Sequence, residues 1–198
     1  MDVEEALVHW RYFLSLERDV EILKNYIEIS DGNFNAYSME LHKILQLACS
    51  EIDSVLRVLC KKIDPNTDYH DEAIYSGKIS QYKTTIIGRF PRIYESKILV
   101  PGLSDPLQPW SDWQTVNSPE WWVGYNKAKH YRHSSYISAN LKNMLMAMSA
   151  LMVSILYLFR LIANKPRANP SPQPMFFDSN YTSPNFLCLP DKELPDFE

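Results

Sequence analysis

The chain has 198 residues, of which 45% are hydrophobic and 22% are charged. These proportions are typical of a single globular domain with a sizeable core, and they exclude a disordered chain. The formal net charge of −4 disfavours a protein that coats nucleic acid non-specifically, although it leaves room for a local basic surface. The first ten residues, MDVEEALVHW, are acidic where a signal peptide would be basic, which predicts a cytoplasmic protein.

The three cysteines, Cys49, Cys60 and Cys188, do not form the pattern of a disulfide framework. Cys49 and Cys60 would lie ~16 Å apart along one helix, too far to pair with each other. Reduced thiols are typical of a cytosolic protein. The sequence also lacks a CxxC pair, an HExxH motif and a glycine-rich phosphate loop, so we expect no cofactor and no metal.

The first part of the chain has the spacing of amphipathic helices. Apolar residues recur at intervals of three and four over residues 3–29 and, more strongly, over residues 37–63. The second run stops at Asp64-Pro65, because proline cannot continue a helix. Within that run, Asp53 and Arg57 are one turn apart, so we expect an ion pair on the helix surface. Trp10, in the first run, is expected to fill the core.

A third helix is expected over residues 66–90, ending before Pro91. Residues 93–100 alternate poorly, which leaves a short strand or an extended strap as alternatives. Four prolines and two tryptophans follow, and this composition predicts an ordered connector that lies over the core. These six residues are Pro101, Pro106, Pro109, Pro119, Trp110 and Trp113.

The last two helices are expected around a basic, aromatic run. Ser118, Pro119 and Glu120 predict a helix start with serine as the N-cap, and that helix should reach about residue 133. Another helix is expected from Tyr136 or Ile137 to residue 163. A membrane span needs ~20 apolar residues, and the charge-free segment 144–159 is shorter than that. We therefore expect a buried core helix and no membrane association, with a membrane span as the alternative.

Seven of the 13 prolines lie between residues 164 and 198, together with several large apolar side chains. This composition predicts an extended arm that packs either on the bundle or on a second subunit. The expected fold class is therefore all-α. A bundle of about five helices, with a Trp- and Pro-rich connector, would occupy residues 1–163, and a proline-rich C-terminal arm would occupy residues 164–198.

Residues 121–133, WWVGYNKAKHYRH, are the candidate site. On a continuous helix Asn126, Lys129, His130 and His133 would share one face, with Lys127 to one side and Arg132 flanking it. Cationic Lys129 and Arg132 would bind phosphate, while His130 or His133 would act as a general acid or base. These groups suffice to cleave RNA without a metal.

The aromatic side chains of the same run, such as Tyr125 and Tyr131, could stack on bases. The structural alternative is that Asn126 and His130 only form hydrogen bonds to neighbouring helices. Zinc binding through His130 and His133 is weakly supported, because two ligands without a nearby acid or thiol do not make a site.

The run Trp121-Trp122-x-x-Tyr125-Asn126-x-x-Lys129-His130-x-Arg132, followed by Ala139-Asn140-Leu141 and a long apolar helix, resembles a group of uncharacterised bacterial proteins in the HEPN-like helical superfamily. Residues 47–57 are similar to the first core helix of that group, and the resemblance covers roughly residues 40–163. It implies an all-α bundle, often a homodimer, in a superfamily that includes ribonucleases of toxin–antitoxin and phage-defence systems. RNA and an antitoxin-like or other protein are the partners that it implies.

The chain departs from the catalytic members of that superfamily in one respect. Those members carry an arginine followed, after four to six residues, by a histidine, and no arginine of this chain has that spacing. The nearest pairs are Lys127 with His133 and Asn126 with His133, and lysine lacks the planar fork of arginine that binds phosphate. Two hypotheses follow. One is an RNA-directed protein with metal-independent endoribonuclease activity, and the other is a non-catalytic binding or assembly module with a structural Asn-Lys-His-Arg site.

Overall fold

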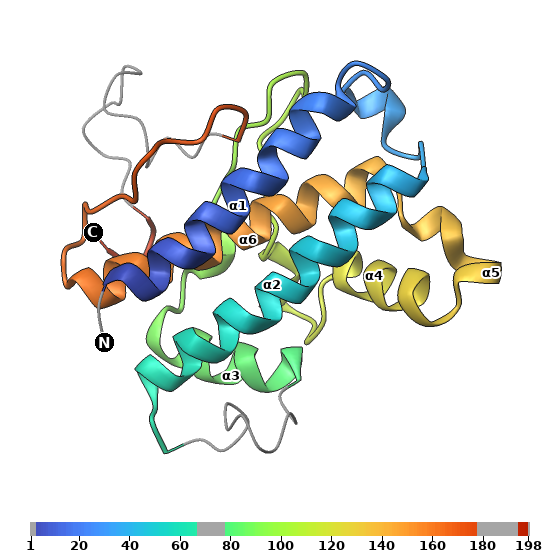
Figure 1. Ribbon diagram of the computed structural model, residues 1–198. Coiled ribbons are helices and arrows are strands. Elements are labelled where there is room, and N and C mark those ends of the chain that lie inside the picture. The colour runs from blue at the N-terminus through green and yellow to red at the C-terminus, as the bar shows by residue number, and fades with distance from the viewer. Residues whose placement is uncertain (1–2, 67–77, 178–193, 198) are drawn as a thin grey trace.

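The computed structural model describes residues 3–66, 78–177 and 194–197, which form a helical bundle (Figure 1). Extended backbone pairs only at two isolated bridges in these ranges, and no strand forms there. The predicted all-α fold is confirmed. The described residues form six α-helices: α1 (Val3–Leu23), α2 (Met39–Ile63), α3 (Ile79–Arg89), α4 (Glu120–His130), α5 (Arg132–Ser135) and α6 (Leu141–Ala163).

Helix α6 lies at the centre of the bundle. Helices α1 and α2 lie side by side in front of it and run antiparallel to each other, and α4 packs on it as well (Figure 1). Every residue from 147 to 160 is buried. By length and composition α6 could cross a membrane, but 83% of its most apolar window is buried inside the protein. This burial is typical of the core helix of a soluble protein.

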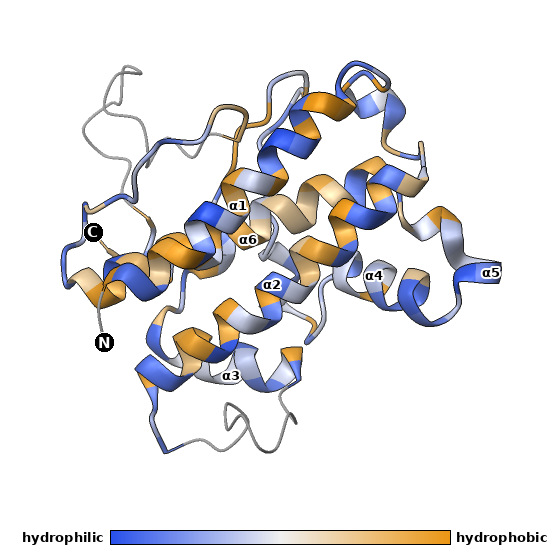
Figure 2. Ribbon diagram, viewed as in Figure 1, coloured by the Kyte–Doolittle hydropathy of each residue, from blue (hydrophilic) through white to orange (hydrophobic). Residues whose placement is uncertain are grey.

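The apolar spacing correctly predicted where α2 lies. Hydrophobic residues follow its inner face while hydrophilic ones face outward (Figure 2). The helix begins where the Ser38 side chain accepts a hydrogen bond from the Leu41 backbone. The expected ion pair is confirmed, with 2.8 Å between Arg57 Nε and Asp53 Oδ2. The Tyr82 hydroxyl of α3 also donates to Asp53, over 2.9 Å.

Four expected helix bounds were wrong, and the fourth, the end of α4, is described with the site. Helix α1 ends at Leu23, six residues early, because the backbone from 24 to 27 closes into turns. The third helix does not begin at Asn66, which lies in a turn, and residues 67–77 are outside the described ranges. The last helix begins at Leu141 because the Asn140 side chain caps it, accepting a hydrogen bond from the Asn143 backbone.

The connector between α3 and α4 is ordered and packs on the core, as predicted. Trp110 and Trp113 are buried, with ring centroids 4.0 Å apart. Trp121, in the first turn of α4, packs edge-to-face on Trp110 and donates from Nε1 to the Pro109 carbonyl over 2.7 Å. The expected serine N-cap was wrong, because the Asp112 carboxylate accepts the hydrogen bond of the first α4 amide. The connector therefore positions α4.

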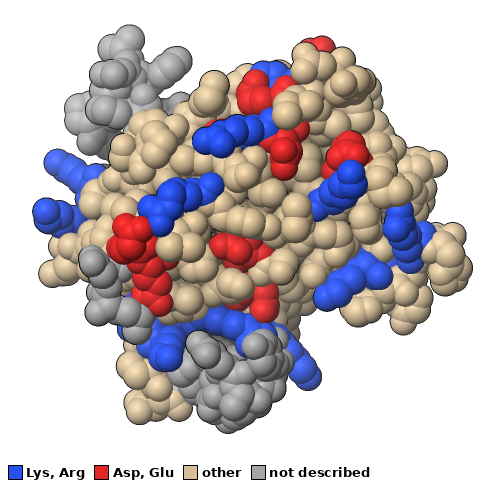
Figure 3. All heavy atoms as spheres, in the orientation of Figure 1, with Lys and Arg blue, Asp and Glu red and all other residues tan. Residues whose placement is uncertain are grey.

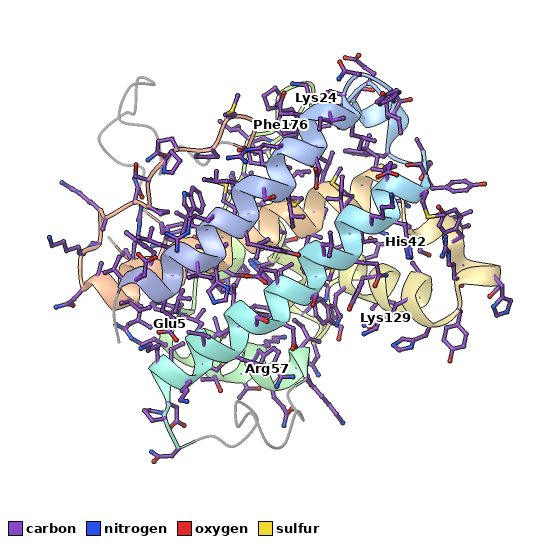
Figure 4. The ribbon with its side chains drawn as sticks, in the orientation of Figure 1. Glu5, Lys24, His42, Arg57, Lys129 and Phe176 are labelled. Atoms are coloured by element: carbon purple, nitrogen blue, oxygen red, sulfur yellow. The ribbon has the colours of Figure 1, made fainter. Side chains whose placement is uncertain are left out.

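Residues 172–177 of the arm pack along α1 (Figure 1), whereas residues 194–197 contact α6, where the Tyr157 hydroxyl donates to Asp196 over 3.0 Å. Phe176 and Phe177 are buried in the core, and Phe176 lies beside Lys24 in Figure 4. Glu17 of α1 is 2% exposed, and its carboxylate accepts three backbone hydrogen bonds from the arm. The donors are the amides of Met175 at 2.9 Å, Phe176 at 2.7 Å and Phe177 at 3.0 Å.

Candidate functional site

Helix α4 ends at His130, and this break changes the expected site. Tyr131 has φ −126° and ψ 43°, which lies outside the helical region, and Arg132 starts the short helix α5. His133 therefore belongs to a different helix from Asn126, Lys129 and His130. The predicted stripe along one continuous helix does not form.

The break nevertheless brings four predicted site residues around one open depression of about 670 Å³. We call this surface the basic corner, and it consists of Lys129, His130, Arg132, His133 and Tyr136. Its four basic side chains are all exposed. Lysine and arginine spheres lie over α4 and α5 in Figure 3, without acidic spheres beside them on that face. Within the described ranges, no three His, Cys, Asp or Glu side chains are grouped so that they could hold a metal.

The N-terminal end of α2 supports the basic corner from behind. The Arg132 guanidinium lies over the Tyr136 ring at 5.3 Å, and its Nη2 is 3.1 Å from the Met39 sulfur. The Tyr136 ring in turn contacts the rings of Tyr37 and His42, each with centroids 5.7 Å apart. These contacts fix the direction of Arg132.

His42 lies beside the basic corner, in contact with Tyr136, although sequence reasoning did not select it. Figure 4 shows His42 on α2 and Lys129 on α4 at the same end of the bundle. The His42 Nδ1 atom is buried and has no hydrogen-bond partner among the described residues. Burial, and to a lesser degree the Arg132 guanidinium, lower the pKa of His42 below its ordinary value of 6.5. His42 is therefore a neutral imidazole beside a cation at pH 7.

Tyr125 positions Lys129 from below. The Tyr125 side chain is 6% exposed, so its ring does not offer a face to a base. Lys129 Nζ donates to the Tyr125 hydroxyl over 3.3 Å and lies 5.5 Å from the ring centroid. Burial raises the pKa of Tyr125, which keeps the hydroxyl protonated and neutral. Tyr131, in contrast, is 61% exposed and is the aromatic residue of the run that can stack on a ligand.

Asn126 and Lys127 lie apart from the basic corner. Asn126 is half-buried and makes no side-chain hydrogen bond with the described residues. Lys127 lies on a different face of α4, where it lines a second depression of about 420 Å³. The structure thus gathers Lys129, His130, Arg132 and His133, with Tyr125 beneath Lys129, and places Asn126 and Lys127 outside this group.

The neighbourhood of His42 and Arg132 gives a prediction about pH. Because folding lowers the pKa of His42, the folded state binds fewer protons than the unfolded chain below pH 6.5. The free energy of unfolding should therefore decrease as the pH falls below 6.5. Arg132→Gln should raise the pKa of His42 towards 6.5 without reaching it, since burial remains. Titration of the His42 ring signal by NMR measures this.

Lys43→Gln is the matched control, because Lys43 follows His42 in the chain but pairs with Glu40 at 2.7 Å. It should leave the His42 titration unchanged. An unaltered His42 pKa in the Arg132→Gln protein would contradict the assigned contact.

Comparisons of the chain with protein-family models, with curated proteins and with solved structures found no match. The resemblance to HEPN-like proteins therefore stays a prediction from the residues quoted above.

Proposed function

We propose that this is an RNA-directed, HEPN-like protein that binds the phosphate backbone of RNA at the basic corner. The observation that carries the proposal is the open depression shared by Lys129, Arg132 and two exposed imidazoles, with no acidic residue lining it. A guanidinium held against an aromatic ring is a rigid phosphate donor, and the ammonium beside it adds a second charge. A local basic surface of this kind is compatible with the overall charge of −4.

Single-stranded RNA is the form that suits the surface best. The depression is open, and the exposed ring of Tyr131 lies in the chain between His130 and Arg132. Aromatic side chains beside a cationic groove bind splayed bases by stacking, which requires an unpaired strand.

Binding of a labelled oligoribonucleotide should depend on both cations. We expect Arg132→Gln and Lys129→Gln each to weaken binding roughly tenfold, the loss of one charge-assisted hydrogen bond. The slope of log K against log salt should fall by about 0.7 for each lost phosphate contact. Fluorescence anisotropy at several salt concentrations measures both quantities.

Lys97→Gln is the control for the loss of one charge, because Lys97 is exposed and lies outside the basic corner. Its effect should be within the error of the titration. Equal weakening by Lys97→Gln and Arg132→Gln would show that only the overall charge matters, and would contradict a site at the corner.

Metal-independent cleavage of the bound RNA is the second function that we propose. It is favoured by the position of His130 and His133 on the same depression as the two cations. One imidazole would take the proton of the ribose 2′-hydroxyl as this oxygen attacks phosphorus. The other would give a proton to the departing 5′-oxygen, leaving a 2′,3′-cyclic phosphate and a free 5′-hydroxyl. Lys129 and Arg132 would stabilise the charge that develops on the phosphate.

Cleavage should continue in a chelating buffer and should yield cyclic-phosphate ends. We expect His130→Ala to slow it by about 10²-fold, the usual contribution of a general acid or base, while circular dichroism shows an unchanged fold. Arg132→Ala, which removes the guanidinium that binds the phosphate, should abolish the activity. Intact RNA across a broad panel of substrates would rule out the enzyme.

The alternative is a non-catalytic binding or assembly module. It is supported by the contacts that already engage the cations, Lys129 with Tyr125 and Arg132 with Tyr136. RNA binding without cleavage would identify it. The resemblance further leads us to propose a cytoplasmic homodimer with an antitoxin-like or other protein partner in a bacterial defence system, which sedimentation and co-purification can test.

A further inference from the structure

A second pocket lies next to the basic corner, and the roles proposed above leave it unused. Its volume is about 420 Å³, within the usual range of small-molecule sites. Glu120, Val123, Gly124 and Lys127 of α4 line it. Their spacing in the chain places all four on one face of the helix, which forms one wall of the pocket.

The opposite wall is the junction between residues 34–37 and the start of α6. Two backbone hydrogen bonds hold this junction, from Leu141 to the Ala36 carbonyl at 2.8 Å and from Lys142 to the Phe34 carbonyl at 3.2 Å. Tyr37 and Asn140 also form an isolated antiparallel bridge. The wall is therefore fixed in the free protein, which lowers the cost of ordering it around a ligand.

Two asparagines of this wall present unused polar groups. Asn140 Oδ1 accepts a hydrogen bond from the Asn143 amide at 2.9 Å, and Asn143 Nδ2 donates to the Ser138 carbonyl at 2.8 Å. The Asn140 Nδ2 donor and the Asn143 Oδ1 acceptor therefore have no hydrogen-bond partner among the described residues. Asn140 and Asn143 both line the pocket, and a donor and an acceptor are the two kinds of group that the edge of a nucleobase also presents.

The remaining surface of the pocket suits a flat ring. Tyr37, Val123 and Ile137 line it and are 51%, 39% and 62% exposed, so their apolar atoms are available to a planar ligand. Gly124 allows the close approach of α4, because a Cβ there would lie 2.4 Å from Asn143 Nδ2. A side chain at this position would displace Asn143.

An aromatic pair joins the pocket to the basic corner. Tyr37 lines the pocket and Tyr136 lines the corner, and their rings meet edge-to-face with centroids 5.7 Å apart. A ligand that extends past this pair would contact both depressions. A polynucleotide has the required form, since its bases and phosphates alternate along the chain.

We propose that the pocket binds one nucleobase of a single-stranded RNA whose phosphates are bound at the basic corner. The base lies between Val123, Ile137 and Tyr37, its edge is bound by Asn140 and Asn143, and Lys127 contacts an adjacent phosphate. The inference rests on the proposed function, because it places the base within an RNA bound at the corner.

The test compares two oligoribonucleotides of equal length, one with all its bases and one with abasic ribose throughout. We expect the wild-type protein to bind the base-bearing strand about tenfold more tightly, the effect of one stacked and hydrogen-bonded base. Ile137→Ser and Gly124→Ala should reduce this preference to the part that stacking on Tyr131 provides, and should leave binding of the abasic strand unchanged. Val116→Ser is the matched control, because Val116 is 48% exposed and lines neither depression.

The possible outcomes separate the pocket from the proposed function. Equal binding of the two strands, both weakened by Arg132→Gln, would overturn the base pocket and leave RNA binding in place. If neither strand binds, the proposed function fails. Titration with 5′-nucleoside monophosphates then shows whether the pocket binds a nucleobase at all. If the nucleotide shifts the side-chain amide NMR signals of Asn140 and Asn143, the pocket stands as a site for a free nucleotide. If these signals do not shift, the base pocket is overturned as well.

Discussion

Replacing Glu17 by alanine is expected to lower the free energy of unfolding by about 4 kcal/mol. The Glu17 carboxylate is the acceptor for three backbone amides of the arm, two of them in buried bonds. Each buried amide left without an acceptor costs about 1–3 kcal/mol. The total loss for three amides is smaller than three times that cost, because water reaches the amides as the arm detaches. Urea denaturation measures the loss, and limited proteolysis should show earlier cleavage near Phe176.

The control for this prediction lies one turn further along α1. Glu21 only pairs with Lys24 on the surface, at 3.1 Å, so Glu21→Ala should change the stability by less than about 0.5 kcal/mol. If Glu17→Ala were as mild as Glu21→Ala, the three amides would find other acceptors, and the carboxylate would not be what holds the arm.

Trp121→Ala should also lower the free energy of unfolding by about 4 kcal/mol. The side chain is 1% exposed and contacts Trp110, and large aromatic-to-alanine changes in a core cost about 3–5 kcal/mol. The Pro109 carbonyl would also lose its hydrogen-bond donor. Because Trp121 joins α4 to the connector, its loss should also weaken RNA binding at the other end of that helix. Denaturation and anisotropy on the same sample measure the two effects.

Trp121→Phe separates packing from the hydrogen bond. Phenylalanine retains an aromatic ring against Trp110 but cannot donate to Pro109, so we expect a loss of only about 1–2 kcal/mol. A Trp121→Ala protein that lost less than the phenylalanine variant would show that the tryptophan cluster does not stabilise α4.

The sequence predicted the elements whose apolar residues face one core. The end of α2 could be predicted because Pro65, after Asp64, cannot continue a helix. The burial of α6 could be predicted from its long charge-free segment. The break between α4 and α5 at Tyr131 could not be predicted, because no glycine or proline lies there in the sequence. It arises from the backbone angles of one tyrosine, and it moves His133 off the predicted stripe.

The partners of the site residues were also beyond sequence reasoning. His42 and Arg132 are ninety residues apart in the chain, and their proximity depends on how α5 meets the end of α2. Gly124 allows the close approach of α4 to Asn143, and nothing in the local sequence indicates that contact. Local spacing predicted the types of group at the site, whereas tertiary packing decided which of them meet.

The place of α6 in the chain order affects how the protein is made. Both α1 and α2 pack on α6, although it follows them by many residues. During synthesis on the ribosome α1 and α2 can contact each other, but the apolar faces that pack on α6 stay uncovered until residues 141–163 have emerged. Completing the core then requires contacts between distant parts of the chain, which slows folding. The newly made N-terminal half is consequently the stage at which aggregation competes with folding, and at which a chaperone would protect the chain.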